Sequence, residues 1–293
     1  HTDPLNRQIT VGLGCFLEVM VMAAAEQGYR IDLTLFPEGT DASGLTKAPV
    51  AIAKFIQDAA VKPDPLFAHV MQRRTLKEPF DLTKPVPQAS LDAMLASGQY
   101  GTSLAGSVDA KSTAEIRALT GDALQIEIDT PRTYKESVDL FRIGKSEIEA
   151  NPDGIDFSGA LFESLALIGQ FDRNVVMDRN SASFAQGVAA VLENAQTAMG
   201  HIWMVTKGNS REDQIASGRD WVRVNLAATA LGVGFQPLSQ ALQEYPEMAE
   251  IYKSVHARFA PEGGTVQMLS RLGYGPSVSV SPRWPLEAKI IKA

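Results

Sequence analysis

Two long apolar stretches share a pattern that limits what the chain can fold into. Residues 9–27 and 211–231 each place apolar side chains along one stripe at helical spacing, which predicts two long amphipathic helices. Each stretch carries two alanines and then a glycine at the same spacing, Ala23-Ala24 with Gly28 and Ala227-Ala228 with Gly232. Small residues let helix backbones approach closely, and helices often end at glycine. The shared pattern indicates either a chance likeness or two related lobes packed as an internal pseudo-dimer.

The remaining segments alternate between helical and strand-like patterns. Strands are predicted at residues 31–36, 50–56, 201–206 and 265–273, and shorter helices at 66–72, 88–96, 112–128, 133–141, 158–169, 183–197 and 246–259. The run Lys62-Pro63-Asp64-Pro65 interrupts these patterns, because proline lacks a backbone donor and restricts the residue before it. It predicts a boundary between two lobes.

Composition narrows the classes of function. The 293 residues carry a net charge of −7, so their electrostatics favour neither nucleic acid nor an anionic membrane. The sequence has no uninterrupted apolar run of about 18 residues, so no membrane span is predicted. Cys15 is the one cysteine, which excludes an intrachain disulfide, and its apolar helical surroundings favour a buried, unreactive thiol. Because the first residue is His1, we expect a truncated or processed chain, and its location stays open between cytoplasmic and exported.

The motifs of several enzyme classes are missing from the sequence. Gly12-Leu13-Gly14 and Gly232-Val233-Gly234 lack the third glycine of a dinucleotide-binding loop, and neither a G-x-x-x-x-G-K-[ST] loop nor a G-x-S-x-G elbow occurs. The four histidines are isolated from one another, so no metal site is predicted. What remains is an enzyme whose chemistry belongs to an organic cofactor, or a binding protein.

The stretch Arg73-Arg74-Thr75-Leu76-Lys77 carries the main candidate binding residues. Two guanidinium groups, a hydroxyl and an ammonium lie within five residues. They suit a phosphate monoester, because arginine offers forked donors and lysine a compact charge. The alternative is a solvated helix end whose charges complement the helix dipole. Nearer the C-terminus, Gly273 and Gly275 permit either a close approach of the backbone or a positive φ, and Arg283 is either an exposed strand end or part of a binding site.

Three stretches, taken in order, resemble the FMN-dependent nitroreductase family. They are Arg73 to Phe80 followed by Pro85-Val86-Pro87 and a helix, the helix ending at Gly232 followed by residues 236–240, and residues 266–276 followed by Pro282-Arg283-Trp284-Pro285-Leu286. They occur in this order within residues 64–293. Upstream, Asp3-Pro4 and Gly12-Leu13-Gly14-Cys15 are similar to the two-lobed, Acg-like branch, in which two nitroreductase-like halves are fused.

The resemblance implies an α+β, nitroreductase-like fold with a mainly antiparallel sheet wrapped by helices and two fused pseudo-symmetric lobes. Residues 1–63 would form a partial N-terminal lobe and residues 64–293 a C-terminal lobe. A helical insertion at about 133–180 would act either as a lid over the flavin or as extra core. The whole would be a monomeric pseudo-dimer or a homodimer.

The same resemblance implies FMN as the cofactor and points to its binding residues. Arg73 and Thr75 match positions that contact the phosphate and ribityl chain, and Lys77 matches one at the pyrimidine edge. The other matching positions are Arg74 as a neighbour, Pro237, Leu238 and Ser239 beside the flavin ring, and Arg283 and Arg271 in a second phosphate-binding stretch. The N-x-Q-P-W stretch of the family, which reaches the flavin from the opposing half, is absent and is expected to precede His1.

The function that the resemblance implies is an FMN-dependent NAD(P)H oxidoreductase of the nitroreductase type. Its partners would be NAD(P)H and a small-molecule electron acceptor, a nitroaromatic or a quinone by analogy. The flavin moves the hydride and a lysine at its pyrimidine end stabilises the reduced state, so no catalytic side chain is required. The alternatives are a flavin-binding or flavin-sequestering protein without turnover, and a structural lobe that has lost its cofactor.

Overall fold

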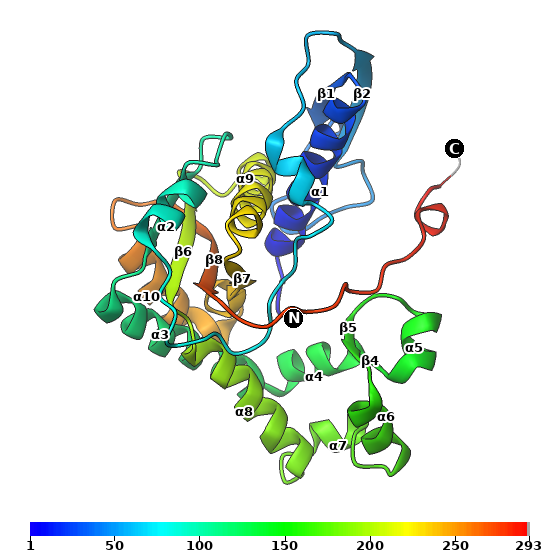
Figure 1. The fold of residues 1–293 in the computed structure, drawn as a ribbon, viewed down its shortest axis with the longest axis vertical. Helices are drawn as coiled ribbons and strands as arrows, with labels where there is room; N and C mark the ends of the chain where they lie inside the picture. The colour runs from blue at the N-terminus through cyan, green and yellow to red at the C-terminus, as the bar shows by residue number, and fades with distance from the viewer. Residues whose placement is uncertain (292–293) are drawn as a thin grey trace. The chain divides into compact units, whose positions relative to one another are not determined.

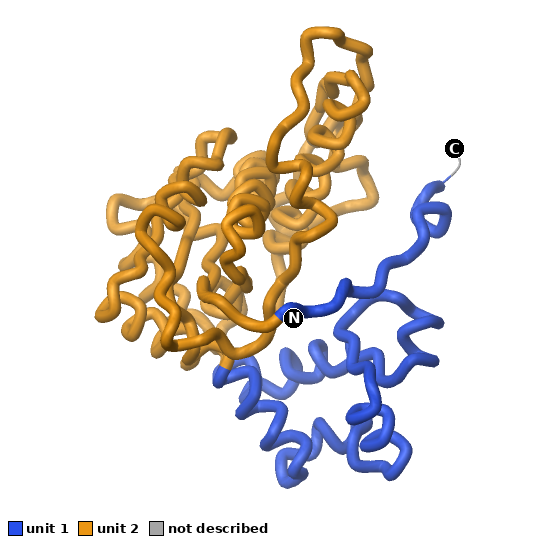
Figure 2. Tube along the Cα trace, viewed as in Figure 1, with its two compact units in different colours: residues 1, 125–193, 277–293 blue, residues 2–124, 194–276 orange. Residues whose placement is uncertain are grey.

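The structure, a computed structural model, describes residues 1–291 and has the α+β architecture that was predicted. The chain divides into two compact units, shown in Figure 2. Unit 2 comprises residues 2–124 and 194–276, and unit 1 comprises residue 1, residues 125–193 and the residues from 277 onward.

A four-stranded antiparallel sheet forms the centre of unit 2 (Figure 1). Its strands lie in the order β3 (Ser103–Ser107), β6 (Gly200–Thr206), β8 (Thr265–Gly273) and β7 (Gly234–Pro237), so that β7 is an edge strand. Side chains alternate between the two faces of a strand. On β6, Ile202 and Met204 are fully buried in the core, whereas Trp203 lies against Phe259, with ring centroids 4.5 Å apart.

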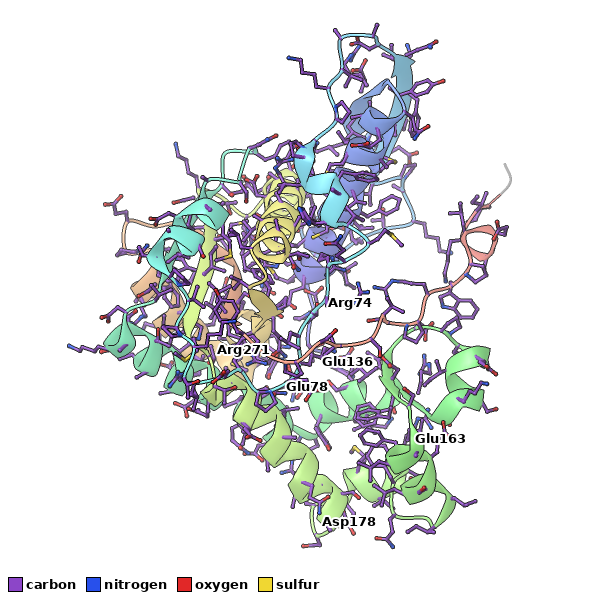
Figure 3. The ribbon with its side chains drawn as sticks, in the orientation of Figure 1. Arg74, Glu78, Glu136, Glu163, Asp178 and Arg271 are labelled. Carbon is purple, nitrogen blue, oxygen red and sulfur yellow. The ribbon has the colours of Figure 1, made fainter. Side chains whose placement is uncertain are left out.

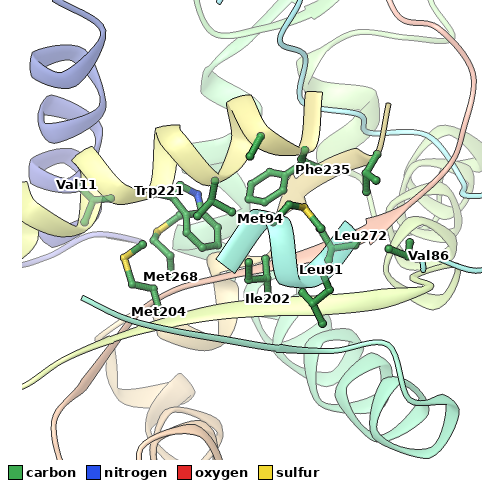
Figure 4. Packing of buried hydrophobic residues seen from close by; sticks show 14 residues of the cluster. Val11, Val86, Leu91, Met94, Ile202, Met204, Trp221, Phe235, Met268 and Leu272 are labelled. Atoms are coloured by element: carbon green, nitrogen blue, oxygen red, sulfur yellow. The ribbon is translucent and has the colours of Figure 1, made fainter. Parts of the chain in front are cut away.

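The larger hydrophobic core lies between this sheet and two helices, α2 (Gln88–Leu95) and α9 (Arg211–Ala230) (Figure 4). Trp221 of α9 is buried and meets Phe235 of β7 edge to face, with ring centroids 5.1 Å apart. Unit 2 also contains the helices α3 (Ala110–Asp129), which continues into unit 1, and α10 (Ala249–Phe259), and the 3₁₀ helices η1 (Pro65–His69), η2 (Ser239–Leu242) and η3 (Pro246–Met248).

The helix α1 (Arg7–Glu26) packs directly against α9, and both helices contain 20 residues. The carboxylate of Asp3 accepts hydrogen bonds from the backbone N–H groups at the start of α1. Ser210 and Asp213 form a capping box at the start of α9. Both arrangements satisfy donors that have no partner inside the helix, so each helix has a defined first turn.

Both long helices end at a glycine in the left-handed conformation, as the sequence predicted. Gly28 follows α1 with φ 75°, and Gly232 follows α9 with φ 66°. A strand comes next in each case, β1 (Tyr29–Leu35) after Gly28 and β7 after Gly232. β1 pairs antiparallel with β2 (Ala51–Gln57), and β7 pairs antiparallel with β8. The order of helix, glycine and antiparallel strand pair therefore occurs twice in unit 2.

By length and composition α1 is apolar enough to cross a membrane, with a mean hydropathy of 1.7 over 18 residues. Two of its three charged side chains, Arg7 and Glu18, form ion pairs inside unit 2, and the third, Glu26 near its end, is exposed. Arg7 is fully buried and donates to Glu244 at 2.7 Å, and Glu18, only 1% exposed, accepts from Arg223 at 2.8 Å. The core helix of a folded domain meets the same criteria of length and composition, and these buried ion pairs are typical of such a helix.

Unit 1 has a small aromatic core of its own. Its elements are α4 (Pro131–Asp139), β4 (Phe141–Ile143), α5 (Gly144–Ala150), β5 (Ile155–Phe157), α6 (Ala160–Leu167), α7 (Arg173–Met177), α8 (Ala182–Gln196), which runs into unit 2, and η4 (Leu286–Ala288). Val138, Phe171 and Val176 are buried there, and the rings of Phe157 and Phe171 lie 5.1 Å apart. Residues 133–180, the predicted insertion, are largely helical and lie within this unit.

Candidate functional site

The basic stretch of residues 73–77 runs beside the edge strand β7. The predicted helix at 66–72 is shorter than expected: η1 ends at His69, and residues 73–77 form neither helix nor strand. The backbone N–H of Leu76 donates to the carbonyl of Phe235 in β7 at 3.1 Å. Two of the three stretches that carry the family resemblance are thereby neighbours in unit 2.

Several donors of this stretch have no partner among the described residues. Arg74 donates from Nη1 to the carbonyls of Met71 and Arg73, at 2.9 and 2.8 Å, but its Nε is buried and makes no hydrogen bond. The hydroxyl of Thr75 and the exposed ammonium of Lys77 also make none within residues 1–291. An uncommitted guanidinium N–H, hydroxyl and ammonium within four residues form a donor set that suits an anionic, oxygen-rich ligand.

The backbone of the same stretch is held by side chains from other elements. Arg271 of β8 donates from Nη2 to the carbonyl of Leu76 at 3.2 Å and to that of Glu78 at 2.7 Å. Asn194 of α8 donates from Nδ2 to the carbonyl between them, that of Lys77, at 2.8 Å. Figure 3 shows Arg271 and Glu78 close together, with Arg74 farther along the stretch.

Glycines on the sheet make room for the apolar side chains of this stretch. A Cβ on Gly234 would lie 2.8 Å from both Leu76 and Phe80, and a Cβ on Gly273 would overlap the Phe80 ring. A Cβ on Gly275 would come within 2.9 Å of Leu76. Of the two roles expected for Gly273 and Gly275, close approach is the one that they fill, and neither has a positive φ. Leu76 and Phe80 are both buried as a result, at 6% and 3% exposure.

Arg271, which the sequence placed in a phosphate-binding stretch, is fully buried and directs its donors to the protein. Besides the two carbonyls, Nε donates to Gln236 at 2.6 Å and Nη1 to Thr197 at 3.3 Å. Its guanidinium also lies 3.9 Å from the centroid of the Phe80 ring. Burial lowers the pKa of Arg271 to about 9, against the opposing effect of the Glu78 carboxylate. Through these contacts Arg271 links the stretch at residues 76–80 to Gln236 and Thr197.

Residues 237–239, predicted to lie beside the flavin ring, mark the transition from β7 to η2. Pro237 is the last residue of the strand. Leu238 is buried and its N–H donates to the carbonyl of Leu269 at 2.9 Å. The carbonyl of Ser239 accepts from Gln8 at 3.3 Å, while its hydroxyl makes no hydrogen bond within the described residues. The segment is thus anchored by its backbone.

Arg283 belongs to unit 1, whereas the other predicted site residues all belong to unit 2. It lines a cavity of about 370 Å³ together with Trp284 and Lys289. The indole N–H of Trp284 donates to Asp153 at 2.8 Å, and the Lys289 ammonium lies 4.8 Å from the centroid of the Trp284 ring. Arg283 itself is exposed and donates to the carbonyl of Pro282.

Sequence reasoning missed Asn194 and Thr197 from the end of α8. Asn194 bonds the carbonyl of Lys77, and Thr197 accepts from the N–H of Phe80 at 3.0 Å, in each case across 117 positions of sequence. No local pattern marks either residue, since an asparagine and a threonine near a helix end are ordinary. Within the described residues, no three His, Cys, Asp or Glu side chains gather as a metal ion would require.

The chain is similar to known proteins over almost its whole length, although no family model matches it. Proteins from two strains of Mycobacterium tuberculosis, which carry the provisional name NAD(P)H nitroreductase, are 25% identical to it over 284 residues. The matched region is 94% of this chain and 73% of those proteins.

Two solved structures share a weaker likeness. One is a nitroreductase with bound FMN from Bacteroides fragilis, 13% identical with a TM-score of 0.43. The other is an FMN-dependent nitroreductase from Mycobacterium smegmatis in complex with NADPH, 19% identical with a TM-score of 0.44. In each case the match covers 78% of this chain and 98% of the other.

Proposed function

We propose that this chain, a member of the nitroreductase superfamily by its sequence relationship, is an oxidoreductase that uses FMN to pass hydride from NAD(P)H to a small-molecule acceptor. The observation that carries the proposal is the uncommitted donor set of Arg74, Thr75 and Lys77 on the edge of the sheet. The relatives support it, because their provisional name is NAD(P)H nitroreductase.

The residues present suit the parts of FMN in different ways. The buried Nε of Arg74 and the hydroxyl of Thr75 can donate to phosphate or ribityl oxygens. The Lys77 ammonium is exposed and unpaired within the described residues, so it can face the pyrimidine end of the ring. A bound flavin supplies the hydride chemistry. The chain then has to bind the flavin, orient it and stabilise negative charge, which these donors can do.

The test is spectroscopic. Protein incubated with FMN and freed of excess ligand is expected to retain the visible absorption of oxidised flavin. Addition of NADPH or NADH without oxygen should bleach that absorption, and a nitroaromatic or a quinone should restore it. Failure of the protein to retain FMN would refute the proposal outright.

The same experiment separates the oxidoreductase from its alternative. A protein that sequesters flavin would retain FMN but would leave its absorption unchanged on addition of either nicotinamide cofactor. Free FMN mixed with NADPH at the same concentrations is the control for direct reduction. The rate with the protein must exceed that rate for the enzyme function to stand.

A further inference from the structure

We propose that Arg271 and Asn194 are positioning residues that fix the place of the Lys77 ammonium. We call the two side chains the Arg271–Asn194 clamp. The inference rests on the proposed function for its ligand, because it assigns the clamp a part in how the chain holds and tunes a flavin. It departs from the expectation that Arg271 touches phosphate itself.

The clamp holds the backbone of the stretch at residues 76–78. Three consecutive carbonyls, those of Leu76, Lys77 and Glu78, accept hydrogen bonds from the clamp at 3.2, 2.8 and 2.7 Å. Carbonyls of an irregular surface segment commonly bond to water instead. Because the clamp residues come from β8 and α8, each bond ties the stretch to a regular element of unit 2.

The clamp residues are buried, whereas two of the side chains on the stretch that they hold are exposed. Arg271 is fully buried and Asn194 is 8% exposed, whereas the side chains of Lys77 and Glu78 are exposed. Leu76 and Phe80, on either side, are buried against the sheet. The backbone at Lys77 is therefore fixed on both sides while its own side chain projects outward. The clamp residues already donate to protein oxygens. They can therefore act on a ligand through the stretch that they hold, from which the Lys77 side chain projects.

The two clamp residues differ in how far their buried polar atoms are satisfied by hydrogen bonds. A guanidinium without a carboxylate in direct contact is unfavourable in the interior unless its donors are satisfied. Arg271 meets this requirement with four oxygen acceptors, two of which belong to the stretch that it holds. The Oδ1 of Asn194, in contrast, is buried and has no partner among the described residues. The amide therefore contributes one hydrogen bond to the stretch and little else to stability.

Three substitutions in the clamp follow from this difference. Asn194→Ala removes the bond to Lys77 together with an unpartnered oxygen, so the global fold should be little affected. Arg271→Met keeps a long apolar stem and removes all donors, and Arg271→Lys restores one cationic donor. Arg7→Met is the matched control, because Arg7 is equally buried and donates to the carbonyls of Leu242 and Gln267 in another part of unit 2.

The first measurement is hydrogen exchange of the backbone amides in FMN-free protein. The N–H groups of Leu76 and Phe80 are bonded to Phe235 and Thr197, so their exchange reports whether the stretch opens. In Asn194→Ala and Arg271→Met we expect exchange at both amides to be faster by about fivefold or more, the scale of one lost hydrogen bond. In Arg7→Met it should stay at the wild-type rate once global stability is accounted for. Unchanged exchange in both clamp variants would show that there is no clamp.

The second measurement uses the FMN-loaded protein and a double-mutant cycle. Asn194→Ala should lower the midpoint potential of the bound flavin, because a displaced ammonium stabilises the reduced form less. A tenfold loss of that preference corresponds to about 30 mV for two electrons. Arg271→Lys should recover part of the shift caused by Arg271→Met. In a Lys77→Met background, Asn194→Ala should cause no further shift, since coupled residues are not additive.

The outcomes keep this inference separate from the proposed function. If the wild type retains no FMN, the proposed function fails and the ligand part of the inference fails with it, while hydrogen exchange still decides whether the clamp holds the stretch. If FMN is retained but Asn194→Ala shifts the potential equally with and without Lys77, the clamp does not act through Lys77. An unchanged potential in both clamp variants, with faster exchange, would likewise overturn the positioning role.

Discussion

Gly14 of α1 and Gly218 of α9 lie against each other where the two helices cross, and each occupies the space that a side chain on the other would need. A Cβ on Gly218 would overlap the carbonyl oxygen of Val11, and a Cβ on Gly14 would overlap that of Ile215. The relationship is reciprocal, since Val11 and Ile215 stand three residues before Gly14 and Gly218 respectively. Reciprocal contacts of this kind are those of a two-fold interface.

Replacing either glycine with alanine should separate the helices. We expect Gly14→Ala and Gly218→Ala each to lower the free energy of unfolding by about 3 kcal/mol, the upper range for overpacking a core. Gly12→Ala is the control on the same helix, because Gly12 is exposed and a Cβ there would meet nothing within 4 Å. It should raise stability by about 0.5–1 kcal/mol through helix propensity. Denaturant unfolding of the three variants measures both effects, and equal stabilities would contradict the packing argument.

Arg73→Ala should weaken FMN binding by about 1.5–3 kcal/mol, the scale of a hydrogen bond to a charged group. The reason is its place at the start of the donor-rich stretch, before Arg74 and Thr75. Arg30→Ala, on the exposed strand β1, removes a guanidinium from unit 2 without touching this stretch. Titration calorimetry should show the loss only for Arg73. Equal FMN affinity of Arg73→Ala and wild type would argue against Arg73 as a ligand for the phosphate.

Lys77→Met should lower the midpoint potential of bound FMN while leaving much of the binding intact. Methionine keeps a long stem but removes the charge, and reduction concentrates negative charge at the pyrimidine end of the ring, so the reduced form loses more stabilisation. Lys54→Met, on the exposed strand β2, controls for the change in net charge. Equilibrium titration against a redox dye measures the potential. An unchanged potential with full binding would reject the tuning role of Lys77.

His201 should make the folded state sensitive to acid. Burial, with the positive charges of Arg117, Arg271 and Arg258, lowers the pKa of His201 from 6.5 to about 3, and neither ring nitrogen has a partner among the described residues. Between those two pH values the unfolded chain binds a proton that the folded chain does not. The free energy of unfolding therefore falls as the pH falls, by up to about 1.4 kcal/mol per pH unit from this residue.

The measurement is denaturant unfolding of wild type and His201→Leu at several values between pH 7 and pH 4. Because carboxylates titrate in both proteins, the difference between the two curves isolates the histidine. The stability of wild type should decrease more steeply than that of the variant as the pH falls through 6.5. Parallel curves would mean that His201 is protonated in the folded state or accessible to water.

Cys15 should react slowly with thiol reagents. Burial raises the pKa of its thiol to about 11, although the Arg73 guanidinium acts in the opposite direction. The reactive thiolate is therefore scarce near neutral pH. Alkylation by iodoacetamide at pH 8 should be at least about tenfold slower than for the same protein unfolded in urea. Equal rates would show that the thiol is exposed.

The elements with strong hydrophobic periodicity could be predicted from the sequence. The strand at residues 265–273 has the predicted bounds, and both long helices begin and end within two residues of the prediction. In contrast, β7 at residues 234–237 is not among the predicted strands, because a stretch with glycine at one end and proline at the other resembles a turn. Pro237 is tolerated there since β7 is an edge strand.

Only those features of the candidate site that depend on residue types close together in the sequence could be predicted. Residues 73–77 were identified because their side chains suit a phosphate. Gly273 was singled out because glycine permits close approach or a positive φ, but its contact with Phe80 became clear only from the structure. The contacts of Arg271 with Leu76 and Glu78 join residues more than 190 positions apart. The tertiary fold decides such contacts, so a sequence pattern could suggest a cationic residue on β8 but not which oxygens it would meet.

The crossing of α1 and α9 also sets an order of events during synthesis. Its two glycines are 204 residues apart in the sequence (218 minus 14). At about 5–20 residues per second, the ribosome delivers α9 roughly 10–40 s after α1. Throughout that interval α1, with its mean hydropathy of 1.7, lacks its packing partner. The nascent chain therefore carries an apolar helix without its packing partner for longer than most small domains need to fold, and exposed apolar surface favours aggregation during that interval.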